Sequence, residues 1–197
     1  YWGYTKIGVM PDDMLKDFWK ETKALVKEAQ QLHDPNQILA LINASHHLKL
    51  KSNAIVGKYL NMFLREFISE DEADVFPVGH IIKPFGLKSD ICHQDSTIVE
   101  EEEGHFSLNA WVSFVDSNRM NGCIWALPGS HTFEHYYRPF IPNPFFEKPI
   151  TKDIWKKMTP IHSEPGEVLL FHRSLVHGSS RNYLPWARIA AESIIKT

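Results

Sequence analysis

The feature that most constrains the fold is a change in hydrophobic periodicity near residue 74. Before it, residues 4–9 predict a short strand, Pro11-Asp12-Asp13 begins a helix with apolar residues at helical spacing, and residues 52–68 show one apolar helical face. After it, short β-rich runs alternate with turn residues. These runs cover residues 75–84, 91–99, 106–116, 123–127, 167–171 and 188–195.

This pattern predicts an α+β chain that is mainly β. Strands of this length and spacing are typical of an antiparallel sandwich or barrel, so we expect the N-terminal helices to pack outside it. With 197 residues, the chain is long enough to bury a substantial core, and we expect a single domain over residues 1–197. Within it, residues 1–73 form the helical part and residues 74–197 the β part.

The composition favours a protein that acts on a small molecule. The chain is 43% hydrophobic and 23% charged, with a formal net charge of -3, so it has no basic excess that would attract nucleic acid. No apolar run is long enough for a membrane span. The two cysteines, Cys92 and Cys123, lie in apolar stretches, which predicts a reducing, cytoplasmic location. No targeting segment is recognisable, and because the chain begins at Tyr1 rather than a methionine, this says nothing about a segment that has been removed. The sequence leaves the oligomeric state open.

Three residues have the chemistry of a metal site. On a strand, residues i and i+2 point to one face, so His93 and Asp95 can reach one ion. A His-x-Asp pair alone is common, but His177 on a later strand end adds a second imidazole. Two imidazoles and one carboxylate form the facial triad of non-heme Fe(II) oxygenases, which leaves positions open for other ligands. Arg188, on the next strand, offers a rigid cationic fork suited to a carboxylate.

These residues occur within a longer series of motifs. The chain resembles the phytanoyl-CoA dioxygenase family of Fe(II)/2-oxoglutarate-dependent oxygenases from about residue 3 to residue 195. The matching segments are Ile82-Lys83-Pro84, His93-Gln94-Asp95, the strand with Trp111, Asn121-Gly122-Cys123, Leu127-Pro128-Gly129-Ser130-His131, Gly166-Glu167, Phe171-His172, and His177-Gly178-Ser179 with Asn182 and Arg188.

The resemblance implies a double-stranded β-helix core, the jelly-roll or cupin-like fold, and assigns roles to residues. His93, Asp95 and His177 would bind Fe(II), while Arg188 and Ser179 would bind the distal carboxylate of 2-oxoglutarate. Further candidates for lining the co-substrate pocket are Trp111, Lys83 and Asn109. For Lys83, which precedes a proline, a surface cation is the other interpretation.

The resemblance also implies a reaction. 2-Oxoglutarate and O2 would be consumed, with succinate and CO2 as products, while an unactivated C–H bond of a small metabolite or biosynthetic natural-product intermediate is hydroxylated. Family members that halogenate have a small residue in place of the aspartate, so Asp95 argues against halogenation. Desaturation, epoxidation and cyclisation use the same site and stay open. A catalytically inactive jelly-roll protein that binds a metabolite is the non-enzyme alternative.

Residues 132–165 are rich in proline and aromatic side chains. Long segments of this kind are often lids over a site, and the alternative is a loop packed on the sheet by its own side chains. Tyr136, Tyr137 and Arg138 are candidate substrate anchors within this lid-like insertion. His131-Thr132-Phe133-Glu134-His135 also fits a zinc-peptidase pattern, but the pattern needs a helix and this segment follows a Pro-Gly turn.

Overall fold

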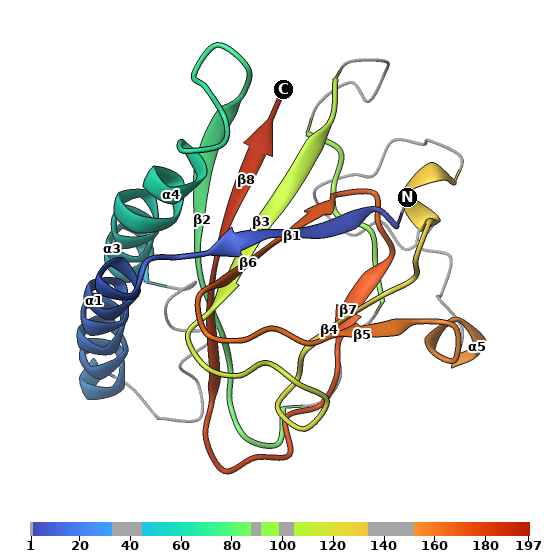
Figure 1. The fold of residues 1–197 in the computed structure, drawn as a ribbon. Coiled ribbons are helices and arrows are strands. Elements are labelled where there is room, and N and C mark those ends of the chain that lie inside the picture. Colours follow the sequence, from blue (N-terminus) through green and yellow to red (C-terminus); the bar gives the residue numbers. More distant parts are fainter. Residues whose placement is uncertain (1, 33–44, 88–91, 99–104, 134–151) are drawn as a thin grey trace.

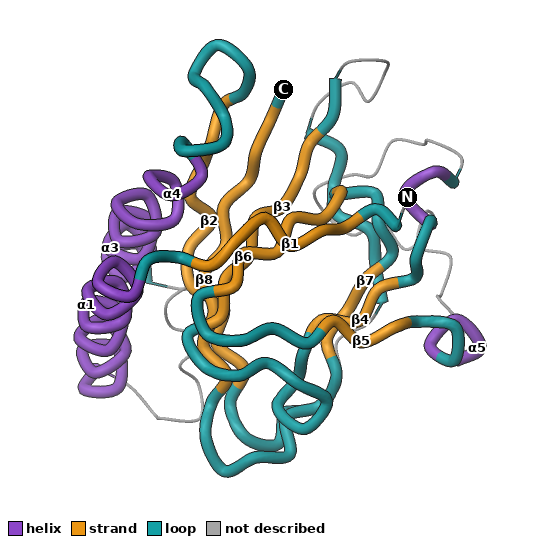
Figure 2. Tube along the Cα trace, in the orientation of Figure 1, coloured by secondary structure: helices purple, strands orange, loops and turns teal. Residues whose placement is uncertain are grey.

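The protein consists of two facing antiparallel sheets, with helices on the outer side of the larger sheet (Figure 1). In Figure 2 the strands of the two sheets lie opposite each other and are joined by long loops. Among the described helices, none is long and apolar enough to cross a membrane. The computed structural model describes residues 2–32, 45–87, 92–98, 105–133 and 152–197.

The larger sheet has the strand order β1-β6-β3-β8-β2, with every neighbouring pair antiparallel. In the smaller sheet, β4 lies between β5 and β7. The strands of the larger sheet are β1 (Tyr4–Val9), β2 (Asp74–Lys83), β3 (Ser107–Ser113), β6 (Glu167–His172) and β8 (Arg188–Lys196). Those of the smaller sheet are β4 (Ile124–Ala126), β5 (Thr159–Ile161) and β7 (His177–Ser179).

Side-chain alternation gives the larger sheet two different faces. On β8, Ile189 and Ala191 belong to the core beneath the helices, whereas Ala190 packs in the core between the sheets. The inner core combines residues of the larger sheet, such as Trp111, with residues of the smaller one, such as Ile124. Alternate residues of one strand therefore stabilise the helical layer and line the interior.

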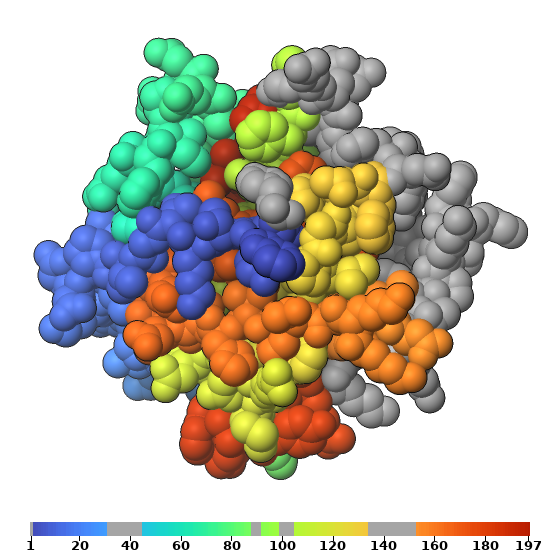
Figure 3. All heavy atoms as spheres, turned by 45° about the vertical axis from the view of Figure 1, so that its right-hand side comes forward, coloured from blue at the N-terminus to red at the C-terminus, as the bar shows by residue number. Residues whose placement is uncertain are grey.

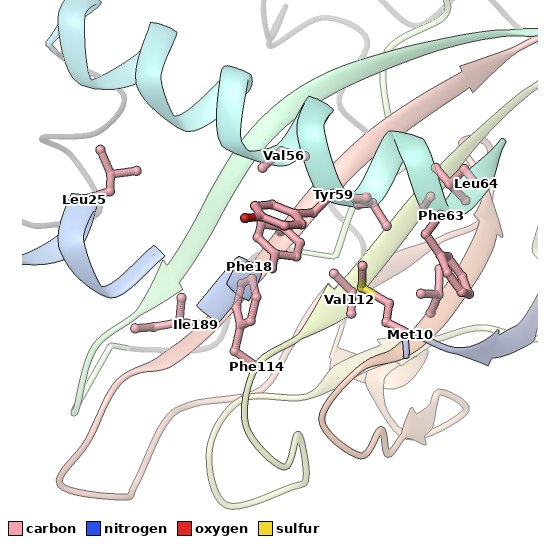
Figure 4. Close-up of a cluster of buried hydrophobic side chains, with 14 of the residues drawn as sticks. Met10, Phe18, Leu25, Val56, Tyr59, Phe63, Leu64, Val112, Phe114 and Ile189 are labelled. Carbon is pink, nitrogen blue, oxygen red and sulfur yellow. The ribbon is translucent and has the colours of Figure 1, made fainter. Parts of the chain in front are cut away.

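The helical layer packs through an aromatic cluster (Figure 4). The Phe18 ring of α1 (Asp12–Leu32) stacks on Tyr59 at 5.0 Å and meets the edge of Phe114 at 4.6 Å between ring centroids. Phe18 is fully buried, so it joins the helices to the sheet. The other helical elements are α3 (His46–Val56), a π-helical turn (Gly57–Asn61), α4 (Met62–Leu64), a 3-10 turn (Ser130–Thr132) and α5 (Lys152–Trp155).

The N-terminal strand contributes to the sheet at its edge. β1 pairs with β6, and the preceding residues contact the segment around the 3-10 turn. The Gly129 N–H donates to the Trp2 carbonyl at 3.0 Å, and a side chain at Gly3 would collide with His131. Figure 3 shows the first residues beside this segment. The N-terminal third thus supplies an edge strand of the sheet as well as helices.

Most predicted elements are confirmed, and the differences have physical causes. The second helix begins earlier, because the Ser45 hydroxyl caps it by accepting from the Leu48 N–H at 3.4 Å, and it ends at Leu64. The predicted strand over residues 91–99 is wrong for the described residues 92–98, which contain a single isolated bridge at His93. Two strands of three residues, β5 and β7, were too short for periodicity to reveal as separate elements.

His80 is held between the sheet and two helices. It lies on β2, with Nδ1 2.9 Å from the Ser52 hydroxyl of α3 and Nε2 2.9 Å from the Thr22 hydroxyl of α1. Burial of the ring lowers the pKa of His80 to about 4. The imidazole is therefore neutral in the folded protein at neutral pH.

We expect this histidine to make the protein acid-sensitive. The folded pKa lies below the unfolded one, so its stabilisation is complete above about pH 6.5 and is lost as the pH falls towards about 4. The difference between the unfolded pKa of 6.5 and the folded pKa of about 4 predicts a loss of up to about 3 kcal/mol in the free energy of unfolding. Urea titrations across this range should show a shallower pH dependence for His80→Gln than for wild type. The control variant His162→Gln, at an exposed position, should keep the wild-type pH dependence of the free energy of unfolding. If His80→Gln showed the same pH dependence as wild type, His80 would not be the source of the acid sensitivity.

Candidate metal centre

His93, Asp95 and His177 come together in the structure. Each offers one ligand atom, and these atoms lie within 4.8 Å of one another. The Asp95 carboxylate is 3.8 Å from His93 Nε2 through Oδ1 and 4.0 Å from His177 Nε2 through Oδ2. Two imidazoles and a carboxylate at this separation form a candidate site for one divalent transition metal.

Backbone hydrogen bonds align the three residues. The His93 N–H donates to the His177 carbonyl and the His177 N–H to the His93 carbonyl, both at 2.9 Å. Asp95 does not lie on a strand; its N–H donates to the Arg173 carbonyl at 2.9 Å. The ligand segment is therefore held to the β6–β7 connection by separate hydrogen bonds rather than by a regular ladder.

The protonation states of this site suit a metal. The His177 Nδ1 is 2.9 Å from the Leu175 carbonyl, and since a carbonyl only accepts, Nδ1 carries the proton and Nε2 keeps its electron pair. Burial holds the pKa of His177 below its usual value, against the pull of Asp95. Burial opposes ionisation of Asp95, but His177, Arg173, His93 and an Asn109 hydrogen bond outweigh it and lower its pKa.

A second polar group lies in the interior at the end of the larger sheet. Lys83 on β2 and Arg188 on β8 are neighbours in the sheet register, and their residues are 2% and 3% exposed. The Lys83 ammonium donates to the Ser179 hydroxyl of β7 at 2.5 Å, so it bridges the two sheets. The Arg188 guanidinium lies 5.3 Å from the ring centre of Trp111. Two neighbouring buried cations with a hydroxyl are a suitable environment for an anion.

The predicted site residues therefore fall into two groups. The metal-ligand candidates converge. The second group contains Lys83, Arg188, Trp111 and Ser179, and Ser179 links it to the first because it lies two residues after His177 on β7. The surface interpretation of Lys83 is wrong, because the strand turns this side chain inward. Asn109 contacts the metal-ligand group, where its amide donates to Asp95 Oδ2 at 2.5 Å. Tyr136, Tyr137 and Arg138 lie outside the described residues, as does most of the lid-like insertion.

Two interior residues near the site, Glu192 and Arg173, were not predicted from the sequence. Glu192 lies four residues after Arg188 on the same face of β8, so the alternation of that strand could have revealed it. Arg173 follows β6 in an irregular turn, where no periodicity signals its direction. In the described part of the chain, Glu192 makes no hydrogen bond or ion pair. Burial, and secondarily the charge of Asp95, raises the pKa of Glu192 to about 8.

Comparison with known proteins identifies the family. The family model for phytanoyl-CoA dioxygenase (PhyH) matches residues 9–188, which is most of the chain. The chain belongs to the phytanoyl-CoA dioxygenase family. This match includes all three metal-ligand candidates and ends at Arg188.

Curated members of the PhyH family are similar over part of their length. The chain is 30% identical to phytanoyl-CoA dioxygenase 1 of Oryza sativa subsp. japonica over 115 residues, which cover 56% of this chain and 40% of the rice protein. It is 35% identical to the phytanoyl-CoA dioxygenase domain-containing protein 1 homolog of Dictyostelium discoideum, over 50% of this chain and 37% of that protein. The chain thus matches less than half the length of these relatives.

Solved structures share the fold at low sequence identity. EctD from S. alaskensis, in a crystal structure with 2-oxoglutarate and 5-hydroxyectoine, is 19% identical, with a TM-score of 0.61 over 100% of this chain and 72% of that one. The non-heme monooxygenase ThoJ is 15% identical, with a TM-score of 0.65 over 100% of this chain and 74% of that one. These similarities confirm the double-stranded β-helix fold.

The raised pKa of Glu192 predicts a pH-dependent stability. Between about pH 4.5 and 8 the folded state keeps a proton that the unfolded state has lost, so Glu192 destabilises the fold progressively as the pH rises through this window. Glu192→Gln removes this titration while keeping the shape. Its free energy of unfolding should match that of wild type near pH 4 and exceed it near pH 8.5 by at least about 1 kcal/mol, since one pKa unit corresponds to about 1.4 kcal/mol. Both proteins are measured without metal. If their free energies of unfolding differed by the same amount at every pH, the prediction would be refuted.

Proposed function

We propose that the chain is a non-heme Fe(II)/2-oxoglutarate-dependent dioxygenase. Its reaction would oxidise an unactivated C–H bond of a small metabolite or natural-product intermediate, with hydroxylation as the proposed outcome. 2-Oxoglutarate and O2 would be consumed, and succinate and CO2 released. The observation that carries this proposal is the convergence of His93, Asp95 and His177, with two buried cations joined to the His177 strand through Ser179. Membership of the PhyH family supports the same reaction class.

The donor set fits Fe(II). Its three ligand atoms come from imidazoles and a carboxylate, and His177 already carries the proton arrangement that a metal-bound histidine adopts. His93 Nε2, an Asp95 oxygen and His177 Nε2 would hold the ion. When bound, Fe(II) would supply the redox chemistry with O2 that the side chains cannot perform. The chain itself would orient the reactants and keep the buried His177 imidazole neutral and Asp95 ionised.

The cationic group fits the distal carboxylate of 2-oxoglutarate. The guanidinium of Arg188 would form charge-assisted hydrogen bonds with it, and the Ser179 hydroxyl would contribute another. Lys83 would fix that hydroxyl and add a second positive charge. Trp111 would orient Arg188, because its ring lies against the guanidinium. Apolar residues of the inner core, including Phe171 and Ala190, would limit the access of water.

Other oxidative outcomes are compatible with the same residues. Two solved structures with this fold are described as a non-heme alpha-ketoglutarate-dependent carbocyclase, SnoK, and epimerase, SnoN, both from nogalamycin biosynthesis. The carbocyclase supports cyclisation as an alternative to hydroxylation, while desaturation and epoxidation are further alternatives. An inactive metabolite-binding protein is the non-enzyme alternative. We also propose a single domain, a small-molecule substrate and a cytoplasmic location.

Formation of the iron and keto-acid complex tests the proposed function. Anaerobic titration of the protein with Fe(II) and 2-oxoglutarate should produce the weak visible charge-transfer band of a keto acid bound to iron. Asp95→Ala should lose the band or require at least about tenfold more Fe(II), because it removes one of three ligands. Asp153→Ala, which removes a surface carboxylate, is the matched control and should keep the band. The absence of a band in wild type with both ligands in excess would contradict the proposal.

The role of Arg188 is tested by the affinity for 2-oxoglutarate. Replacing it with methionine removes charge-assisted hydrogen bonds, which are worth about 1.5–3 kcal/mol, so the dissociation constant should rise by about 10- to 100-fold. The surface variant Arg181→Met should keep the wild-type affinity. Isothermal titration of Fe(II)-loaded protein under anaerobic conditions gives both constants. An unchanged constant for Arg188→Met would place the keto acid elsewhere.

A further inference from the structure

We infer that Arg173 is a positioning residue that acts through Asn109 to hold the Asp95 carboxylate in place for metal binding. The inference rests on the proposed function, because it assumes that Asp95 is a metal ligand. It assigns Asn109 to the metal-ligand group rather than to the co-substrate. The backbone and the side chain of Arg173 contribute separate contacts.

The backbone of Arg173 joins two segments to the β6–β7 connection. Its carbonyl accepts from the Asp95 N–H at 2.9 Å, and its N–H donates to the carbonyl of Ser107 at the start of β3, at 3.1 Å. Arg173 is therefore in contact both with the segment that carries the carboxylate and with the strand that carries Asn109. Its side chain is 8% exposed, so the guanidinium is buried beside the site.

The guanidinium is held by several acceptors. Nη1 donates to the Asn109 side-chain oxygen at 2.7 Å, while Nε and Nη2 lie 3.4 and 3.3 Å from the Ser96 carbonyl. Nη1 is also 4.0 Å from Asp95 Oδ2. These contacts attach the side chain to Ser96, which follows Asp95, and to Asn109 on β3.

The direction of these hydrogen bonds determines how Asn109 faces Asp95. Arginine has donors only, so the side-chain oxygen of Asn109 must face Arg173 and its NH2 group must face the carboxylate. That NH2 donates to Asp95 Oδ2 at 2.5 Å. The amide thus transmits the position of the guanidinium to one carboxylate oxygen. The other oxygen, Oδ1, lies 3.8 Å from His93 Nε2.

Asp95 needs such support because its segment lacks a regular strand ladder. A freely rotating carboxylate would lose orientational freedom on metal binding, and fixing it beforehand lowers that cost. The positive charge of Arg173 acts in the opposite direction, since it repels a cation. A positioning role and a purely electrostatic role therefore predict different results for lysine, which keeps the charge but loses the planar fork.

The test measures Co(II) binding to metal-free protein by its visible absorption, with the folded fraction of each variant checked by circular dichroism. Arg173→Met and Arg173→Lys should each raise the dissociation constant for Co(II) by about 10- to 100-fold and alter the band shape. Arg119→Met, which removes an exposed arginine that contacts Trp125, is the control and should match wild type. If Arg173→Lys kept the wild-type affinity and spectrum, the planar guanidinium would have no positioning role. The same result for Arg173→Met would overturn the inference entirely.

A double-mutant comparison separates positioning from a general structural effect. If Arg173 acts through Asp95, then Arg173→Met should not weaken the residual Co(II) binding of Asp95→Ala further. An additional loss of the same size in the Asp95→Ala background would mean that Arg173 supports the site independently of Asp95, which would overturn the inference while leaving the proposed function intact. Absence of Co(II) binding by wild-type protein would overturn both.

Discussion

The reciprocal pair of backbone hydrogen bonds between His93 and His177 is the contact on which the candidate site depends. It joins residues 84 positions apart in the sequence and fixes the first ligand segment to β7 of the smaller sheet. Because β7 pairs with β4 and β4 with β5, the bridge also fixes the position of both histidines within that sheet. The two histidines of the candidate metal site are therefore positioned by main-chain hydrogen bonds.

Packing on the outer face of the larger sheet positions the residues on its inner face, which include site residues. On β8, Ile189 and Ile195 pack under the helices, while Arg188 and Glu192 project towards the interior. Burial of the apolar residues on the outer face fixes the strand register, because a shift by one residue would exchange the two faces. The same register therefore places both ionisable side chains, Arg188 and Glu192. Lys83 then completes the link, since it reaches from β2 to Ser179 in the smaller sheet.

The parts of the structure that periodicity describes were predictable from the sequence. The helix from Asp12 and strands β3 and β8 are long enough for their apolar pattern to appear. The segment around Asp95 was not predictable, because its position depends on a hydrogen bond to the Arg173 backbone, far away in the chain. For the same reason, motif order could single out Asn109 and Lys83, but their contacts with Asp95 and Ser179 required the three-dimensional structure.

The most direct test of the account is a crystal structure of the protein prepared anaerobically with Fe(II) and 2-oxoglutarate, with diffraction measured on both sides of the iron absorption edge. We expect one anomalous peak bonded to His93, Asp95 and His177, with the keto acid extending from it to Arg188. An iron peak at other residues, or a keto acid bound away from Arg188, would contradict it.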